Sequence, residues 1–225
     1  MKKPLFVEII GETTTGKTTL ASKFPRPLFI DTTPSRESFP IFESVVGKEE
    51  ALKRYRHVES LEEIRKAIQT ATDTATVVID TSTDLQKLAL KEWLKENPDR
   101  KRPLPVEYGE IRRKIDDLIY DVIGKRMLNL VFTSQMTDEY DAEGKKTGRR
   151  IRDGYVKAPD MAGIRLLLKF EQDKNGALKR VCKVIKNRYR DITNPNEYIE
   201  YLDDLSWAGI KKLASPKIAE GEFVE

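Results

Sequence analysis

Short, mainly apolar runs alternate with amphipathic segments along the first 134 residues of the chain. The runs resemble strands that a parallel sheet buries on both faces, and they lie at residues 5–10, 27–31, 76–80 and 128–134. The segments between them place apolar residues at helical spacing, at residues 18–24, 60–71, 85–95 and 107–124. This alternation predicts an α/β fold with a central, mostly parallel sheet flanked by helices.

The pattern changes in the second half of the chain. Residues 136–159 are rich in Asp, Gly, Lys and Arg and lack an apolar period, which predicts a long loop, either functional or disordered. Residues 164–170 and 180–186 alternate like two strands joined by a turn, and they predict a C-terminal antiparallel extension of the sheet.

No linker divides the chain, so residues 1–213 are expected to form a single domain that ends in a short helix at 206–213. The acidic segment 214–225 is expected to be a flexible tail. No apolar stretch approaches the roughly 18 residues that a membrane-spanning helix needs, which excludes a membrane protein. The lone Cys182 cannot form an intramolecular disulfide, and this favours an intracellular, cytoplasmic location.

The net charge of the chain says little about its partners, whereas the distribution of charge along the chain says more. There are 41 Lys and Arg residues against 37 Asp and Glu residues, a net charge of +4. That excess is too small to indicate a nucleic-acid partner, because only clustered charge makes a strong local field. Basic residues do cluster, at 145–157 and at 179–190.

A complete G-x-x-x-x-G-K-[ST] pattern lies between the first predicted strand and the first predicted helix. Glycines let the backbone curl so that successive N–H groups point at a phosphate, and the following helix adds its positive end. A glycine turn with a surface lysine is the alternative, which the strand–loop–helix context disfavours. We therefore expect ATP to bind at Gly11, Glu12, Thr13, Thr14, Thr15, Gly16, Lys17, Thr18 and Thr19.

Asp80 ends the run at residues 76–80 and is the candidate second anchor of this site. A carboxylate at the carboxyl end of a parallel strand lies on the same side of the sheet as the phosphate loop. We expect Lys17 to reach the β- and γ-phosphates, and Thr18 and Asp80 to hold Mg²⁺. The alternative is a plain aspartate that starts a turn.

Four segments, in order along the chain, resemble the ATPase core of the RecA-type recombinases. They are Gly16-Lys17-Thr18-Thr19-Leu20, Val77-Val78-Ile79-Asp80-Thr81, Leu130-Val131-Phe132-Thr133-Ser134-Gln135 and Val184-Ile185-Lys186-Asn187-Arg188. The likeness covers residues 5–192 and is closest to the small phage- or virus-encoded RecA-like proteins associated with single-strand annealing. It implies a P-loop NTPase of the RecA-like type that binds ATP and DNA in recombination, repair or replication.

The resemblance also implies roles for three further residues. Gln135 would sense the γ-phosphate and begin a DNA-binding loop, whereas Lys186 and Arg188 would act in trans on the nucleotide of a neighbouring subunit in a homo-oligomer. The residues alone leave other interpretations open. Gln135 is equally a polar residue at a strand end. Lys186 and Arg188, two apart on one face of a strand, are equally charges that protect an exposed sheet edge.

The basic segment after Gln135 is the candidate surface for single-stranded DNA. Cations follow a phosphate backbone, and aromatic rings stack on unpaired bases. A solvated, flexible loop is the alternative. The candidate DNA-binding residues are Lys145, Lys146, Arg149, Arg150, Arg152, Tyr155 and Lys157.

One position departs from the RecA-type pattern. In that family a glutamate that activates the attacking water stands two residues after the aspartate that ends the second strand. Here Asp31 ends the strand and Thr33 takes the expected place, although threonine cannot accept a proton at neutral pH. Glu37 would substitute if the loop bends, or it is a surface charge. Hydrolysis is therefore expected to be slow, or to depend on DNA or on assembly.

Two other functions remain open on the sequence alone. A P-loop nucleotide kinase would use the same phosphate loop with Arg149, Arg150 and Arg152 as a lid, but it has no need of a sensor at Gln135. A nucleotide-gated loader or regulatory module would bind ATP and barely hydrolyse it, and Thr33 favours that option.

Overall fold

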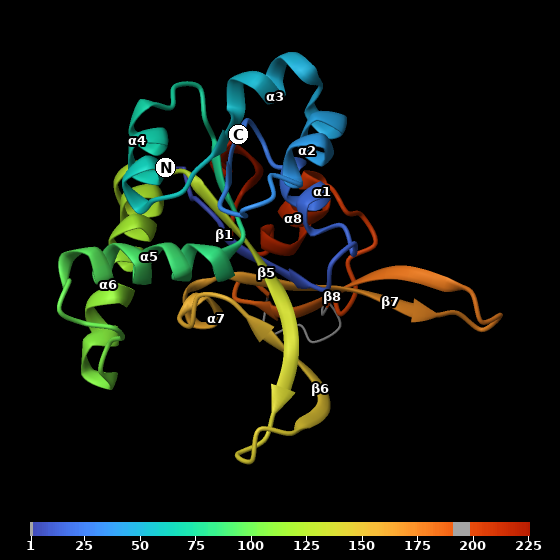
Figure 1. Cartoon of the computed structure of the whole chain (residues 1–225). Helices are drawn as coiled ribbons and strands as arrows, with labels where there is room; N and C mark the ends of the chain where they lie inside the picture. Colours follow the sequence, from blue (N-terminus) through green and yellow to red (C-terminus); the bar gives the residue numbers. More distant parts are fainter. Residues whose placement is uncertain (1, 191–198) are drawn as a thin grey trace.

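The structure, a computed structural model, describes residues 2–190 and 199–225. A central sheet lies at the middle of the fold (Figure 1). Its strand order is β3-β2-β4-β5-β1-β7-β8, with β6 paired to β5 outside this path. All neighbours from β3 to β7 pair in parallel, and β7 pairs with β8 in antiparallel fashion. The strands are β1 (Phe6–Gly11), β2 (Pro27–Asp31), β3 (Tyr55–His57), β4 (Thr76–Asp80), β5 (Asn129–Tyr140), β6 (Lys146–Asp153), β7 (Ile164–Gln172) and β8 (Leu178–Asn187).

Helices cover both faces of the sheet, as the alternation of strand and helix predicts (Figure 1). They are α1 (Lys17–Ser22), α2 (Ser38–Val46), α3 (Lys48–Arg54), α4 (Leu61–Thr70), α5 (Ser82–Glu96), α6 (Tyr108–Ile119), α7 (Ala158–Met161) and α8 (Trp207–Ala214). Short 3₁₀ turns lie at Pro105–Glu107 and Glu220–Glu222, and a π-helical turn at Tyr120–Lys125 extends α6. The α/β fold with an antiparallel C-terminal extension is therefore confirmed.

Two apolar clusters hold the layers together. Consecutive strand residues point to opposite faces of the sheet, so Val77 and Ile79 join one cluster and Val78 joins the other. The first cluster packs against α4, α5 and α6, and the second against α1, α2, α3 and α8. This burial on both faces explains why the strands appear in the sequence as nearly continuous apolar runs.

The prediction of a structureless loop at residues 136–159 is wrong. Strand β5 continues past the sheet and pairs with β6 from Gln135↔Asp153 to Tyr140↔Lys146. Together β5 from Gln135 onward and β6 form a projecting hairpin, which we call the arm (Figure 1). At its tip Asp141 accepts hydrogen bonds from the N–H groups of Glu143 and Lys145, at 2.9 and 2.8 Å. The arm exposes both faces, so it has no apolar alternation that could reveal it in the sequence.

The prediction of a flexible acidic tail is also wrong. Ile218 and Phe223 are buried in the same cluster as α8. The side chain of Asn129 on β5 donates to the carbonyl of Val224 at 2.9 Å and accepts from the N–H of Leu5 at 2.9 Å. The end of the chain thus packs against the amino ends of β1 and β5.

A local signal in the sequence sets the start of α4. The Oγ of Ser60 accepts a hydrogen bond from the N–H of Glu63 at 3.2 Å, which caps α4 as the Ser60/Glu63 spacing predicts. Within residues 2–190 and 199–225, no helix is long and apolar enough to span a membrane.

Candidate nucleotide site

The phosphate loop joins β1 to α1 at the carboxyl edge of the sheet. Thr14 and Gly16 both adopt left-handed backbone conformations, with φ angles of 69° and 93°. A Cβ atom on Gly11 would lie 2.6 Å from the carbonyl oxygen of Leu168 and from the hydroxyl of Thr15. Glycine at position 11 therefore permits the close approach of the loop to β7, and glycine at 16 permits the turn into α1.

Lys17 is buried inside this curled loop. Its ammonium group donates hydrogen bonds to the carbonyl oxygens of Gly11 and Glu12, at 2.9 and 2.7 Å. Burial lowers the pKa of Lys17, and attraction to Asp80 and Glu12 partly opposes that shift. The ammonium group therefore lies where it can meet the β- and γ-phosphates of a nucleotide held by the loop.

Asp80 and Thr18 meet as the sequence predicts. The carboxylate of Asp80 accepts hydrogen bonds from the hydroxyl groups of Thr18 at 2.9 Å, Ser38 at 2.7 Å and Thr133. Burial raises the pKa of Asp80, and the three hydroxyl groups oppose the shift. An aspartate and a threonine hydroxyl side by side supply the oxygen donors that Mg²⁺ prefers when phosphates complete its shell, so the residues fit this ion.

The segment after β2 forms another wall of the site. Thr33 donates hydrogen bonds from its N–H and its hydroxyl to one carboxylate oxygen of Asp31, at 2.8 and 2.6 Å, and Tyr55 donates its hydroxyl to the other. Burial and the Asp31 carboxylate raise the pKa of Tyr55. Thr33 thus turns its hydroxyl toward Asp31. Glu37 lies at the start of α2, is exposed and lines the site.

The phosphate loop, Asp80 and the segment from Thr33 to Ser38 line one cavity of about 320 Å³. Gln135, the first residue of the arm, also lines it, two residues after Thr133 on the same strand β5. The cavity is of a size that small ligands occupy. Among the lining residues, Asp80 and Glu37 are the carboxylates and Lys17 and Arg180 are the cations.

Arg180 is a site residue that sequence reasoning missed. A Cβ atom placed on Gly16 would lie 3.0 Å from a guanidinium nitrogen of Arg180. The antiparallel hairpin explains this contact, because β1 pairs with β7 at Gly11↔Leu168 and β7 pairs with β8 at Leu168↔Cys182 and Phe170↔Arg180. No local pattern marks this arginine, since its neighbours Lys179 and Lys183 give the same basic signal.

The predicted DNA-binding residues fall into two groups. Lys145, Lys146, Arg149 and Arg150 lie exposed on the arm. Lys146 pairs with Asp138 at 2.6 Å, and Arg150 pairs with Asp138 at 3.0 Å and with Glu12 of the phosphate loop at 3.3 Å.

Tyr155 and Arg152 correct the predicted DNA surface. Tyr155 is fully buried, and its hydroxyl donates to Asp116 at 2.6 Å, so it cannot stack on a base. Arg152 pairs with the fully buried Glu8 of β1, which also pairs with Arg165 at 2.7 Å. Both predicted DNA residues instead fix the base of the arm. The segment around Tyr155 and Arg152 is rich in charge, so the sequence does not distinguish these buried or partly buried side chains from their exposed neighbours.

The remaining predicted cations lie away from the phosphate loop. Lys157 pairs with Asp116 and stays partly exposed. Lys186 donates to the carbonyl oxygens of Pro159 and Asp160 at 2.5 and 3.0 Å, and Arg188 donates to the same carbonyl of Asp160. They sit where β8 pairs with the start of β7, at the opposite end of the sheet from their own chain's phosphate loop. Their action on a neighbouring subunit stays a prediction.

Comparison with known proteins agrees with this geometry. The solved structure of the flagellar accessory protein FlaH from Methanocaldococcus jannaschii is similar to this chain, with 12% sequence identity and a TM-score of 0.50 over 83% of this chain and 80% of that one. At this identity the likeness shows the fold, a RecA-like P-loop core. A search of curated protein sequences gave no significant match.

A sequence model of the AAA domain covers the phosphate loop, Asp80 and the arm together. It matches residues 3–160, more than half of the 225-residue chain. The chain therefore belongs to this AAA domain family of P-loop ATPases.

Proposed function

We propose that the protein is a Mg²⁺- and ATP-dependent, RecA-like ATPase that binds single-stranded DNA in recombination, repair or replication in the cytoplasm, as the small phage- or virus-encoded annealing ATPases do. One observation carries the proposal. A single strand, β5, runs from Thr133, which contacts Asp80, through Gln135 in the nucleotide cavity, into the exposed arm. Nucleotide chemistry and a candidate DNA surface thus share one element.

The chain's own residues can hold and orient a nucleotide. The loop N–H groups and Lys17 bind the polyphosphate, while Thr18 and Asp80 position the ion. Bound Mg·ATP supplies the phosphoryl group and the charge that organises it. Glu37 is the carboxylate placed to orient or deprotonate a water molecule, because Thr33 has no group that can accept a proton at neutral pH.

Two ion pairs support coupling between the nucleotide and the arm. Arg150 pairs with Glu12 inside the phosphate loop, and Arg152 pairs with Glu8 three residues before that loop begins. A triphosphate in the loop would add negative charge beside Glu12 and so strengthen the attraction for Arg150. The position of the arm would then depend on the nucleotide.

Charge on the arm limits how it can bind DNA. The acids Asp138, Glu139, Asp141 and Glu143 lie close to the basic residues of β6. Lys145 pairs with Glu143 at 3.1 Å, as Lys146 and Arg150 pair with Asp138. We therefore expect moderate affinity for single-stranded DNA and a steep loss of binding as salt rises.

The test is ATP turnover with and without single-stranded DNA. The expected result is an increase with DNA in the wild type, no turnover in Lys17→Ala, and basal turnover without DNA stimulation in a combined Lys145→Ala, Lys146→Ala, Arg149→Ala variant. A matched control replaces Lys48, Lys66 and Arg113, three exposed cations away from the arm, with alanine. Transfer of phosphate to a nucleoside monophosphate, with no response to DNA, would instead establish a kinase.

A second candidate is a nucleotide-gated loader or regulatory module. The observation that favours it is Thr33, whose hydroxyl donates to Asp31 where the RecA-type pattern has a catalytic glutamate. Such a protein would bind ATP tightly with little turnover even in the presence of DNA.

The proposal includes a homo-oligomer in which Lys186 and Arg188 act in trans. In the monomer both cations bond carbonyl groups at Pro159 and Asp160, so assembly would have to redirect them. Mixing inactive Lys17→Ala chains with Arg188→Ala chains tests this idea. Recovered turnover in the mixture supports action between subunits, whereas turnover no higher than that of the separate variants contradicts it.

A further inference from the structure

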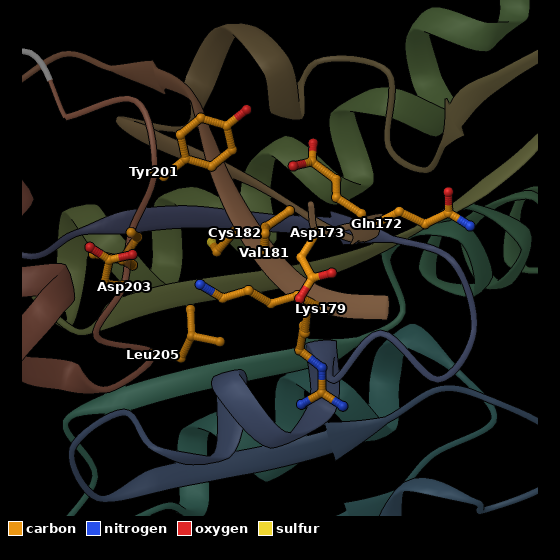
Figure 2. Close-up of a pocket in the computed structure, with 11 residues that line it drawn as sticks. Gln172, Asp173, Lys179, Val181, Cys182, Tyr201, Asp203 and Leu205 are labelled. Atoms are coloured by element: carbon orange, nitrogen blue, oxygen red, sulfur yellow. The ribbon is translucent and has the colours of Figure 1, made fainter. Parts of the chain in front are cut away.

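A second cavity, of about 720 Å³, lies beside the outer edge of β8 (Figure 2). The chain returns to β8 after residue 199, where the N–H of Val184 donates to Glu200 at 2.7 Å and the N–H of Leu202 donates to Cys182 at 2.8 Å. It then crosses to α1, where the carbonyl of Leu205 accepts from Lys23 at 3.0 Å. Strand β8 diverges from this segment toward Leu178. The cavity lies between β8 and the segment 201–205.

Arg180 lines this cavity and the nucleotide cavity alike. The two spaces are therefore neighbours, with the guanidinium group over Gly16 at their boundary. Arg180 also lies 5.8 Å from the ring centre of Phe170, its cross-strand neighbour, which helps to hold the guanidinium in place.

The candidate metal and phosphate ligands lie in a fixed order along the carboxyl edge of the sheet. The metal anchor Asp80 lies on β4 and Gln135 on β5, whereas the phosphate loop follows β1 and Arg180 comes from β8. The γ-phosphate belongs at the β4–β5 end, next to the metal site. Arg180 and the second cavity lie on the other side of the loop, away from the metal site, where a nucleoside has room to extend.

We propose that this second cavity is the nucleoside subsite, and that it takes a purine bearing an exocyclic amino group, with Arg180 holding the polyphosphate where it joins the ribose. This inference rests on the proposed nucleotide-binding function. Val181, Leu202 and Leu205 supply apolar surface for the faces of a base, and the half-exposed ring of Tyr201 can stack on it (Figure 2). The exposed carboxylate of Asp203 can accept a hydrogen bond from an amino group or a ribose hydroxyl.

The first test compares the affinities of the full chain, with Mg²⁺, for ATP, for ITP, which lacks the amino group, and for inorganic tripolyphosphate, which lacks the nucleoside. Tyr201→Ala and Asp203→Ala should each weaken ATP binding ~10-fold and leave tripolyphosphate binding unchanged. Arg180→Ala should weaken both about 10-fold, because a charge-assisted contact to phosphate is lost. Arg113→Ala, an exposed arginine on α6, is the matched control.

The same measurements separate the two levels of inference. Wild-type ATP binding no tighter than tripolyphosphate binding, or ATP affinity unchanged in Tyr201→Ala and Asp203→Ala, would overturn the subsite while leaving the phosphate site intact. Equal binding of ATP and ITP would overturn recognition of the amino group. Failure of every triphosphate to bind the wild type would overturn the proposed function itself.

A second test locates the base directly by crosslinking with 8-azido-ATP and sequencing of the labelled peptides. We expect label at residues 171–182 or 201–205, removed by competing ATP and by Lys17→Ala. All three pocket variants alter exposed side chains, so thermal unfolding should show that each remains folded. If the label that competing ATP removes lay only on the other side of the site, at residues 33–41, the proposal would be overturned.

Discussion

At the scale of single residues, the buried carboxylate of Asp80 links the stability of the protein to pH. Its pKa lies above the ordinary 3.8 because burial disfavours the charged form. The folded protein therefore holds a proton at Asp80 more tightly than the unfolded chain does. Asp80 favours folding below about pH 3.8, and this contribution is lost as pH rises through the folded-state pKa.

The variant Asp80→Asn removes this titration and keeps the side chain's size. We expect its free energy of unfolding, relative to that of the wild type, to rise as pH increases from about 3.8 through the raised pKa of Asp80, and its Mg²⁺-dependent ATP binding to fall at least about 10-fold. Denaturant unfolding at several pH values, with nucleotide titrations, measures both. Parallel stability profiles for the two proteins would contradict the raised pKa.

Glu37 offers a second prediction at this scale. If it orients or deprotonates the attacking water, Glu37→Gln should lower the ATP turnover rate ~100-fold and leave ATP affinity unchanged, because proton transfer contributes to the reaction and not to binding. Steady-state hydrolysis and equilibrium binding separate the two quantities. Glu43→Gln, on the same helix, is the control, and equal turnover in both variants would exclude Glu37.

Single residues also show which parts of the site a sequence can reveal. The phosphate loop and Asp80 were predictable because each lies in a short segment whose spacing is dictated by local backbone geometry. Arg180 was not, since only the pairing of β7 with β8 brings it back to Gly16. The stacking role predicted for Tyr155 was wrong because burial of an aromatic ring depends on α5 and α6, which lie elsewhere in the chain.

At the scale of elements, the base of the arm is fixed by a buried cluster of charges. Glu8 on β1 is fully buried and pairs with Arg152 of β6 and Arg165 of β7, and it accepts a hydrogen bond from Ser134 at 2.7 Å. A buried carboxylate of this kind is stable only while its partners neutralise it. The cluster therefore joins four strands, β1, β5, β6 and β7, directly before the phosphate loop.

Removing the charge of Glu8 should be costly. We expect Glu8→Gln to lower the free energy of unfolding by about 3 kcal/mol, because two arginines lose their carboxylate in a buried setting. Glu171→Gln, which breaks the exposed pair with Lys169, should change it by less than about 1 kcal/mol. Urea denaturation of both variants gives the comparison, and similar values for the two would contradict the structural role of Glu8.

The arm also shows why some elements escape sequence analysis. Strands β1 and β4 are buried on both faces and appear as apolar runs, whereas β5 after Gln135 and β6 are solvated on both faces and give neither a run nor an alternation. Hairpin pairing here depends on backbone hydrogen bonds and on the Asp141 turn. Residues of this composition fit a loop and a solvated ribbon equally well.

At the scale of the whole molecule, the segment 214–225 contributes side chains to the apolar core. The acidic character of residues 214–225 predicted a frayed tail, but three apolar residues within it, Ile218, Phe223 and Val224, pack against the sheet. A backbone hydrogen bond between residues near the two termini supports this packing, since the N–H of Lys3 donates to the carbonyl of Glu222 at 2.8 Å. Composition averaged over the segment concealed the apolar positions.

This packing predicts a large effect from one substitution near the C-terminus. Phe223→Ala should lower the free energy of unfolding by about 3 kcal/mol, because it removes a fully buried ring and leaves a cavity. Lys217→Ala, at an exposed position in the same segment, should change it by less than about 0.5 kcal/mol. Thermal or chemical unfolding measures both, and equal stability of the two variants would show that the segment does not pack.

The continuity of β5 has a mechanical consequence. Its first half is held between β1 and β4, and its second half extends from Gln135 to Tyr140, a reach of about 17 Å. A rotation of about 10° at Gln135 would carry the far end of such a rod through about 3 Å. Spin-label distances between positions 143 and 174, the tips of the two hairpins, would detect this swing. If the arm binds single-stranded DNA as proposed, a small adjustment around a phosphate group would become a displacement large enough to bind or release that strand.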